Sequence, residues 1–147
     1  CKSFKKTYNL DYTIFRFFNT YGNTQSEDFV ISKFIQCALK NEDIKIYGDG
    51  NQSRTFCYID DTIETIINLF NESINLNETI NIGNDNITTI NELVKIIVEI
   101  TDSKSKILYV EPLKDGDMYR RQPDVSKMRR YLEKIISIEE GITKLIS

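Results

Sequence analysis

The sequence predicts an α/β fold, because short β-branched and aromatic runs alternate with segments of helical periodicity along the whole chain. The 147 residues, 40% hydrophobic and 28% charged, have the composition of one ordinary globular domain with a core. A formal net charge of -3 gives no reason to expect nucleic acid as a partner. No apolar run approaches the roughly 20 residues that span a bilayer, so a membrane partner is not expected either.

The first part of the chain predicts a helix, a strand and a second helix. Residues 1–10 resemble the last turns of a helix, with Phe4 and Tyr8 on one face. Residues 12–18, YTIFRFF, are β-branched or aromatic nearly throughout, so we expect a buried strand. After a polar loop, residues 29–41 return to helical spacing.

The middle of the chain predicts two short extended segments joined by a glycine-rich turn. The segments are residues 44–48 and 53–59, and the turn GDGNQ lies between them. Asp60 or Asp61 then offers a side-chain cap for a helix over residues 62–73.

The last part of the chain continues the alternation. We expect strands at 78–83 and 106–112, with an amphipathic helix at 88–101 between them. A threonine at the start of that helix and Glu92 are spaced for a capping box. The remaining expected elements are a charged loop and two short helices, over 113–124, 125–134 and 137–147.

Several classes of site are excluded by what the chain lacks. It contains no histidine, which rules out His-dependent triads and His-ligated zinc within these residues, and no metal site is expected. Cys1, Cys37 and Cys57 have no paired spacing, so we expect reduced thiols, the last two in the core, and a cytoplasmic protein. No strand is followed by a dinucleotide fingerprint, and GDGNQS lacks the ending of a phosphate-binding P-loop.

Arg54 is the candidate with the most chemical information. It follows a turn with two glycines, which let a backbone approach a ligand closely, and it precedes the apolar run TFCYI. A guanidinium fixed at a pocket rim is suited to bidentate phosphate binding. The alternative is a surface arginine paired with Asp60 or Asp49, and the residues alone leave both interpretations open.

Three other positions have a structural and a functional interpretation. Asn19 follows a strand, where it could donate to a ligand oxygen or form a turn with its own backbone. Arg16 lies inside YTIFRFF, and we expect a structural ion pair there. Arg120 and Arg121 lie in a charged loop that is either solvated or a second phosphate clamp near Arg54.

The order of several motifs resembles that of the extended short-chain dehydrogenases/reductases that act on nucleotide sugars. The motifs are RFFNTYG, KFIQCALKNEDIKIYGDGNQSRTFCYIDDTIE, NIGNDNITTINELVKII, RRQPDVSKMRRYL and SIEEGI. The resemblance covers nearly all of residues 1–147 and implies the C-terminal part of a Rossmann-type enzyme with its small substrate-binding subdomain. Within the family the chain is most similar to UDP-glucuronate decarboxylases, and 4-epimerases and 4,6-dehydratases share much of the pattern.

The resemblance also implies binding residues. Arg54 matches an arginine that contacts the diphosphate of the nucleotide sugar, and Asn19 matches an asparagine that hydrogen-bonds the same group. Two further segments match the helix start that lines the nucleotide pocket and the strand that packs along base and ribose, and the loop at Arg120 and Arg121 matches an element near the phosphates. The implied set is Asn19, Ile31, Ser32, Lys33, Phe34, Ile35, Ile46, Tyr47, Gly48, Arg54, Arg120 and Arg121.

This chain departs from the family pattern in several places. Gly22 is followed by Asn23 instead of proline, Phe29 stands where related decarboxylases tend to carry arginine, and YLEKIIS replaces a Gly-Trp-x-Pro element. The glycine-rich NAD site and the Tyr-x-x-x-Lys pair of the family are expected upstream of residue 1. We therefore expect no catalytic residue in this chain and NAD bound mainly by the missing N-terminal half.

The expected function is that of the nucleotide-sugar-binding half of an NAD-dependent enzyme, inactive alone. The parent enzyme would oxidise a sugar at C4 and then decarboxylate, epimerise or dehydrate it, and its ligand would be a nucleotide sugar, a UDP-sugar first of all. The expected protein partner is the missing N-terminal half or a homodimer partner. The alternatives are a stand-alone nucleotide-sugar-binding module and a non-catalytic remnant.

Overall fold

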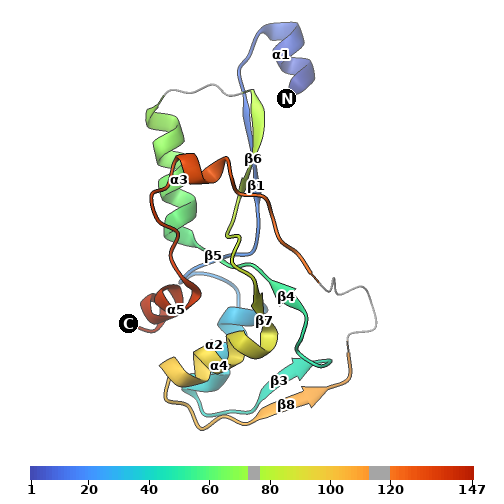
Figure 1. Ribbon diagram of the computed structural model, residues 1–147, viewed down its shortest axis with the longest axis vertical. Helices are drawn as coiled ribbons and strands as arrows, with labels where there is room; N and C mark the ends of the chain where they lie inside the picture. The colour runs from blue at the N-terminus through green and yellow to red at the C-terminus, as the bar shows by residue number, and fades with distance from the viewer. Residues whose placement is uncertain (73–76, 113–119) are drawn as a thin grey trace.

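The computed structural model of the chain describes residues 1–72, 77–112 and 120–147. Helices and strands alternate along these residues, so the predicted α/β class is confirmed. Figure 1 shows two parts, a long two-stranded ribbon with a helix beside it and a group of helices bounded by short strands. Residues 113–119, which belong to the predicted charged loop, lie outside the described residues.

The first part is built on two parallel strands. Strand β1 (Thr13–Phe17) pairs with β6 (Glu78–Ile82), and helix α3 (Ile59–Asn71) lies beside this ribbon (Figure 1). The single turn of 3-10 helix η1 (Met128–Arg130) packs against β6. Apolar residues from these elements and from the segments beside them form a small core cluster: Cys57, Leu69, Ile80, Ile82, Val125, Met128 and Leu132.

Strand β1 is not buried, contrary to the prediction. Phe17 is 53% exposed, and Arg16 is exposed as well. Within the described residues β1 pairs only with β6, so its other edge meets solvent. The expected ion pair of Arg16 is also wrong, because Arg16 makes none with a described residue. Its guanidinium reaches water, so no burial penalty has to be offset.

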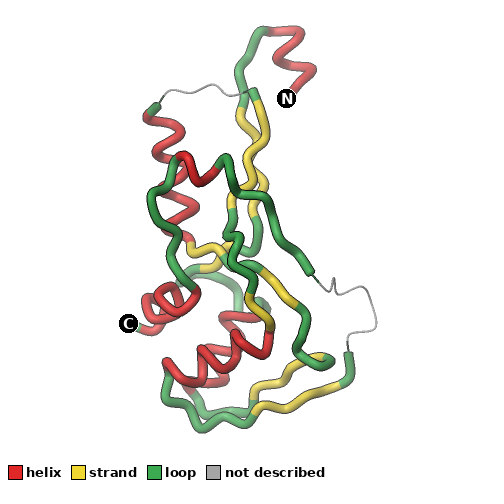
Figure 2. The backbone as a smooth tube through the Cα atoms, viewed as in Figure 1, coloured by secondary structure: helices red, strands yellow, loops and turns green. Residues whose placement is uncertain are grey.

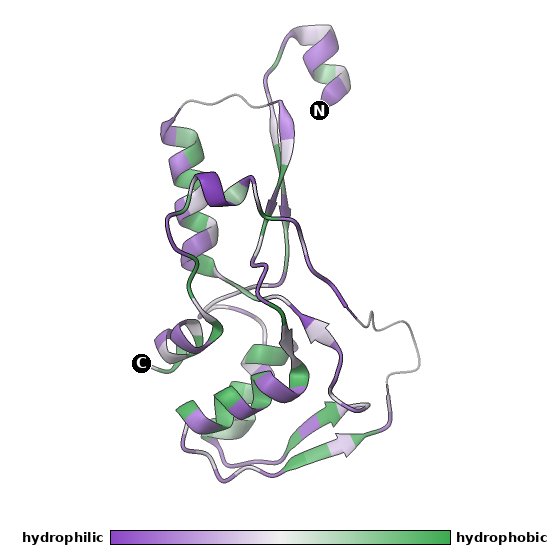
Figure 3. Ribbon diagram, viewed as in Figure 1, coloured by the Kyte–Doolittle hydropathy of each residue, from purple (hydrophilic) through white to green (hydrophobic). Residues whose placement is uncertain are grey.

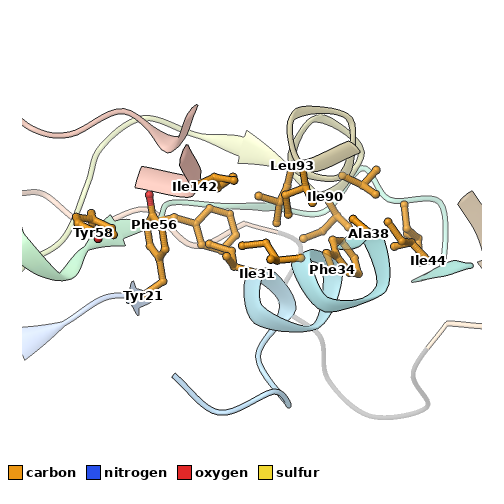
Figure 4. Close-up of a cluster of buried hydrophobic side chains, with 14 residues drawn as sticks. Tyr21, Ile31, Phe34, Ala38, Ile44, Phe56, Tyr58, Ile90, Leu93 and Ile142 are labelled. Atoms are coloured by element: carbon orange, nitrogen blue, oxygen red, sulfur yellow. The ribbon is translucent and has the colours of Figure 1, made fainter. Parts of the chain in front are cut away.

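The second part contains the larger core cluster. Helices α2 (Val30–Leu39), α4 (Ile90–Ile100) and α5 (Ile138–Ile146) surround it, and Figure 4 shows the side chains that meet between α2 and α4. Hydrophobic residues are frequent on both of these helices in Figure 3. The predicted capping box is confirmed, with Thr89 as the N-cap of α4 and Glu92 as its partner.

The remaining strands are short, and the β3–β8 pair lies at the outer edge of the second part, away from the β1–β6 ribbon (Figure 1, Figure 2). Strands β3 (Ile44–Tyr47) and β8 (Ile107–Val110) pair in parallel, and β4 (Ser53–Arg54) pairs antiparallel with β7 (Thr88–Thr89). The predicted extended segment 53–59 is therefore divided. Its second piece, β5 (Cys57–Tyr58), pairs instead with β2 (Thr20–Tyr21), since the chain turns from one sheet to the other between Arg54 and Cys57.

Two predicted helices differ from the structure. Helix α3 starts at Ile59, with Tyr58 as N-cap, so neither Asp60 nor Asp61 caps it. The carboxylate of Asp61 instead accepts a hydrogen bond from the backbone N–H of Ile136 at 3.1 Å. The helix expected over 125–134 is reduced to η1, and the apolar residues of this segment reach the smaller core without a longer helix.

Helix α1 (Lys2–Tyr8) confirms the helix predicted at the start of the chain. Figure 1 shows it at the far end of the β1–β6 ribbon, and none of its residues is buried. The rings of Phe4 and Tyr8 contact each other with centroids 5.4 Å apart. None of the described helices has the length and apolar character needed to cross a membrane.

Candidate functional site

Arg54 lies at the end of β4, where several elements hold it in place. It pairs with Thr88 of β7, and Ser53 beside it makes an isolated bridge with Arg120. The guanidinium donates from Nη1 to the carbonyl of Ser53 at 2.8 Å, and the side chain is half-buried. A short strand anchored on two sides therefore presents the arginine.

The glycine turn before Arg54 packs against helix α4. Gly48 and Gly50 both adopt positive φ, at 73° and 72°, which favours glycine. A Cβ at position 50 would collide with the side chain of Asn91, whose backbone N–H donates to the carbonyl of Gly50 at 3.0 Å. Gly50 is thus required by the contact with the start of α4, and the turn fixes the entry to β4.

Two cavities meet at Arg54. The first, the α2–β3 cavity, has a volume of about 270 Å³ and lies between α2, β3 and the start of α4. The second, the β1–α2 cavity, has a volume of about 340 Å³ and lies between the end of β1, the loop after it and the start of α2. Arg54 and Val30 line both cavities, so the two spaces adjoin at these residues.

The α2–β3 cavity is cationic with apolar walls. Among the described residues that line it are three cations, Lys33, Lys45 and Arg54, and one acid, Asp28. Phe34, Ile46 and Ile90 supply apolar wall, and Tyr47 exposes its ring with the Lys33 ammonium 5.9 Å from the ring centroid. Such a lining suits an anion attached to a planar or apolar group.

Asn19 lines the β1–α2 cavity and is rigidly held. Its side-chain amide donates to the carbonyl of Thr55 at 2.9 Å, and its own carbonyl accepts the N–H of Cys57 at 3.2 Å. Its φ of 42° is a left-handed conformation that asparagine tolerates. The side chain therefore bridges to another segment rather than turning onto its own backbone, and its amide nitrogen carries a second N–H that could serve a ligand.

The predicted binding residues divide between these cavities and their surroundings. The α2–β3 cavity is lined by Lys33, Phe34, Ile46, Tyr47 and Arg54. The β1–α2 cavity is lined by Asn19, Ile31, Arg54 and Arg121, and the guanidinium carbon of Arg121 lies 5.5 Å from the centroid of the Phe18 ring. The structure thus brings most of the predicted set together around Arg54.

Four predicted residues line neither cavity. Ser32 donates to Gln25 at 3.4 Å, and Ile35 is buried in the larger core. Gly48 forms the turn, and Arg120 donates to Gln122 at 2.6 Å. The cavities are lined in addition by residues that sequence reasoning missed: Phe17, Thr20, Tyr21, Gln25, Asp28, Phe29, Val30, Lys45, Gln52, Phe56 and Ile90.

Periodicity could have found some of the missed residues. Lys45 and Tyr47 are two apart on β3 and both exposed, so they share one face of the strand. Val30 lies three and four positions before Lys33 and Phe34 on α2. Phe56 lies two residues after Arg54 in the predicted extended segment 53–59, so the same period of two could have found it. Ile90 comes from a distant segment, and the sequence carries no signal for its approach.

Asp61 is a strongly perturbed carboxyl near this region, and it lines neither cavity. It is only 1% exposed, and burial raises the pKa of its carboxyl to about 6, against the opposing effect of the hydrogen bond from Ile136. Its contacts give it a structural role at the start of α3. Among the described residues, no group of three or more His, Cys, Asp or Glu side chains could hold a metal ion.

A sequence model described as the NAD dependent epimerase/dehydratase family matches residues 1–83. UDP-glucuronic acid decarboxylase 1 of Danio rerio is 33% identical over 150 residues, covering 99% of this chain and 35% of that protein. UDP-N-acetyl-alpha-D-glucosaminuronate decarboxylase of Bacillus cytotoxicus is 34% identical over 163 residues, covering 99% of this chain and 50% of that protein.

Solved structures of nucleotide-sugar epimerases also superimpose on this chain. The UDP-glucose 4-epimerase from Thermotoga maritima, solved with UDP-glucose, superimposes with a TM-score of 0.87 at 30% identity. The UDP-glucuronic acid 4-epimerase from Bacillus cereus, in complex with UDP-glucuronic acid and NAD, gives a TM-score of 0.85 at 26% identity. Each match covers 99% of this chain and 48% of the solved one, so the chain spans about half of these enzymes.

Proposed function

Because the chain belongs to the NAD-dependent epimerase/dehydratase family, we propose that residues 1–147 form the nucleotide-sugar-binding half of an enzyme of this family. The enzyme would oxidise the sugar at C4 with NAD and then epimerise, dehydrate or decarboxylate it. The observation that carries the proposal is the position of Arg54 between two cavities. One ligand with a diphosphate in its middle would fill both.

Each part of a UDP-sugar has a matching surface. The uridine would lie in the α2–β3 cavity, against the ring of Tyr47 and the apolar wall of Ile46. The diphosphate would lie at Arg54, with Asn19 and Arg121 close by, and the sugar would extend into the β1–α2 cavity. Charge-assisted hydrogen bonds from guanidinium to phosphate are among the strongest available for such binding.

Residues 1–147 do not provide a binding site for NAD of the kind that the family uses. The family uses NAD, and the solved relative from Bacillus cereus contains it. In this chain the positive-φ glycines Gly48 and Gly50 form a turn packed on Asn91, not a strand-to-helix phosphate turn. We therefore propose that NAD and the Tyr-x-x-x-Lys pair belong to the other half of the enzyme, and that these 147 residues alone do not turn over substrate.

A stand-alone nucleotide-sugar-binding module is the second candidate. It is favoured by one observation, that described residues of this chain line both cavities. The two candidates agree on binding and differ in whether a complementary half restores activity.

The test is calorimetric titration of the purified chain with UDP, UDP-glucuronate and dTDP. We expect UDP-ligands to bind and Arg54→Ala to weaken binding by about tenfold or more, because a charge-assisted contact is lost. Arg130→Ala is the matched control, since it removes an exposed arginine that lines neither cavity. Equal losses in the two variants, or no binding by a folded chain, would contradict the proposed site.

Absence of turnover is tested separately. The chain mixed with NAD and UDP-glucose should form no NADH and no epimerised sugar, whereas addition of the N-terminal half of a family member should restore turnover if the enzyme proposal holds. Turnover by the chain alone would refute its assignment as a binding half.

A further inference from the structure

The residues that line the β1–α2 cavity favour neutral sugars over uronates. We infer that this chain takes a nucleotide sugar whose hexose is uncharged, such as a neutral, deoxy or N-acetylated sugar, and that it discriminates against uronates. The inference rests on the proposed function, because it assumes that the diphosphate lies at Arg54 and the sugar beyond it.

Aromatic rings form much of the space beyond Arg54. Phe17, Phe29 and Phe56 all line the β1–α2 cavity. Phe17 and Phe29 are 53% and 56% exposed, while Phe56 is almost completely buried. Their positions are set by the backbone, because Phe17 ends β1 and Phe29 is the N-cap of α2. Phenyl rings suit the C–H faces and methyl groups of a sugar, and they cannot donate to a carboxylate.

The charges that line the β1–α2 cavity also favour an uncharged sugar. The described residues that line this cavity include two cations, Arg54 and Arg121, and no acid. A sugar diphosphate carries about two negative charges, and both arginines line the cavity where the diphosphate is proposed to lie. Lys33 and Lys45 line only the α2–β3 cavity, so they lie on the nucleotide side. A uronate would place a third negative charge beside the rings, where the described lining residues offer no third cation, and such a charge is costly to desolvate.

Polar groups also line the cavity: Thr20, Tyr21 and Gln25 carry donors, but none of the three carries a positive charge. The first residues of α2, Val30 and Ile31, line the cavity, and a helix N-terminus attracts anions. Phe29 supplies no side-chain hydrogen bond at that end of the helix. The attraction of a helix N-terminus for an anion is smaller than the cost of desolvating a carboxylate beside the rings.

The experiment compares UDP, UDP-glucose and UDP-glucuronate by calorimetric titration of the unmodified chain. UDP-glucose should bind about tenfold more tightly than UDP-glucuronate. Phe29→Arg should reduce or reverse that ratio by supplying a cation, and the exposure of Phe29 makes the change tolerable for folding. Phe29→Leu, which adds no charge, should keep the preference.

A matched control separates a local cation from a general change in charge. Phe70→Arg adds the same charge at a phenylalanine on α3 that is 83% exposed and lines neither cavity, so it should leave the ratio unchanged. Equal affinities for the two sugars, or tighter binding of UDP-glucuronate, would overturn the inference while leaving the proposed function intact. Failure of UDP itself to bind would overturn both.

Discussion

Replacing Asp61 by asparagine should stabilise the folded chain at neutral pH. Asp61 is a buried carboxyl whose oxygens accept the N–H of Ile136 at 3.1 and 3.3 Å. An asparagine keeps an oxygen that can accept this hydrogen bond, and it removes the buried negative charge. The structure therefore predicts that the amide is the better residue for stability wherever Asp61 is ionised.

The expected size of the effect follows from the pKa of Asp61. Burial raises it from 3.8 to about 6 in the folded chain. A difference of about 2 in pKa between the folded and unfolded chains corresponds to about 3 kcal/mol. The folded chain binds the proton more tightly, so the free energy of unfolding should fall as pH rises from about 4 to about 6 and stay constant above. Asparagine does not ionise, so the free energy of unfolding of the variant should not decline over this pH range. The gain in stability is reduced by about 0.5 kcal/mol, because the attraction between the carboxylate and the N-terminus of α3 is lost.

Urea denaturation at about pH 7.5 and about pH 4 measures both quantities. Asp61→Asn should gain about 2 kcal/mol over the unmodified chain at the higher pH and little at the lower one. The matched control is Asp60→Asn, which removes an exposed carboxylate paired with Lys144 at 3.1 Å and should change stability by less than about 1 kcal/mol. An Asp61→Asn chain that is less stable at about pH 7.5, or that has the same advantage at both pH values, would refute the reasoning.

Two further predictions concern packing and capping, both measured by urea denaturation. Gly141→Ala should cost about 1–3 kcal/mol, because its methyl group would overlap the hydroxyl of Tyr21. Tyr21→Phe alone should be close to neutral, since the buried hydroxyl of Tyr21 has no hydrogen-bond partner in the described part of the chain. In the Gly141→Ala chain, Tyr21→Phe should restore part of the lost stability. Full additivity of the two changes would contradict the contact between these residues. Thr89→Ala should cost about 1 kcal/mol by removing the acceptor for the N–H of Glu92, and an unchanged midpoint would show that the cap contributes nothing to stability.

Elements with a complete local signal were predictable from the sequence. The α4 helix has an amphipathic run, a threonine cap and Glu92 at the capping-box position, and the structure has all three. The helices α2 and α5 were equally clear from their periodicity. The start of α3 was missed because Asp61 is drawn into a contact with Ile136, 75 residues away, that competes with capping.

The site was predictable only in part, for a related reason. Arg54, Lys33 and Tyr47 were identified from motifs, and the structure places them around one cavity. The glycines before Arg54 were interpreted as allowing close approach of a ligand, whereas Gly50 instead makes room for Asn91 at the start of α4. The sequence indicates that a position requires glycine, but it does not identify which group packs against that glycine.

The sequence by itself determined the α/β class, the order of most elements, the lack of histidine chemistry and the choice of Arg54 as a candidate binding residue, since composition, periodicity and motif order carry these. Only the tertiary structure decided that Arg54 stands between two cavities and that Phe17, Phe29 and Phe56 converge on one of them. It also decided that β1 is half-exposed. Such features depend on which distant segments pack together, and a local pattern of residues does not encode the surface that each element meets.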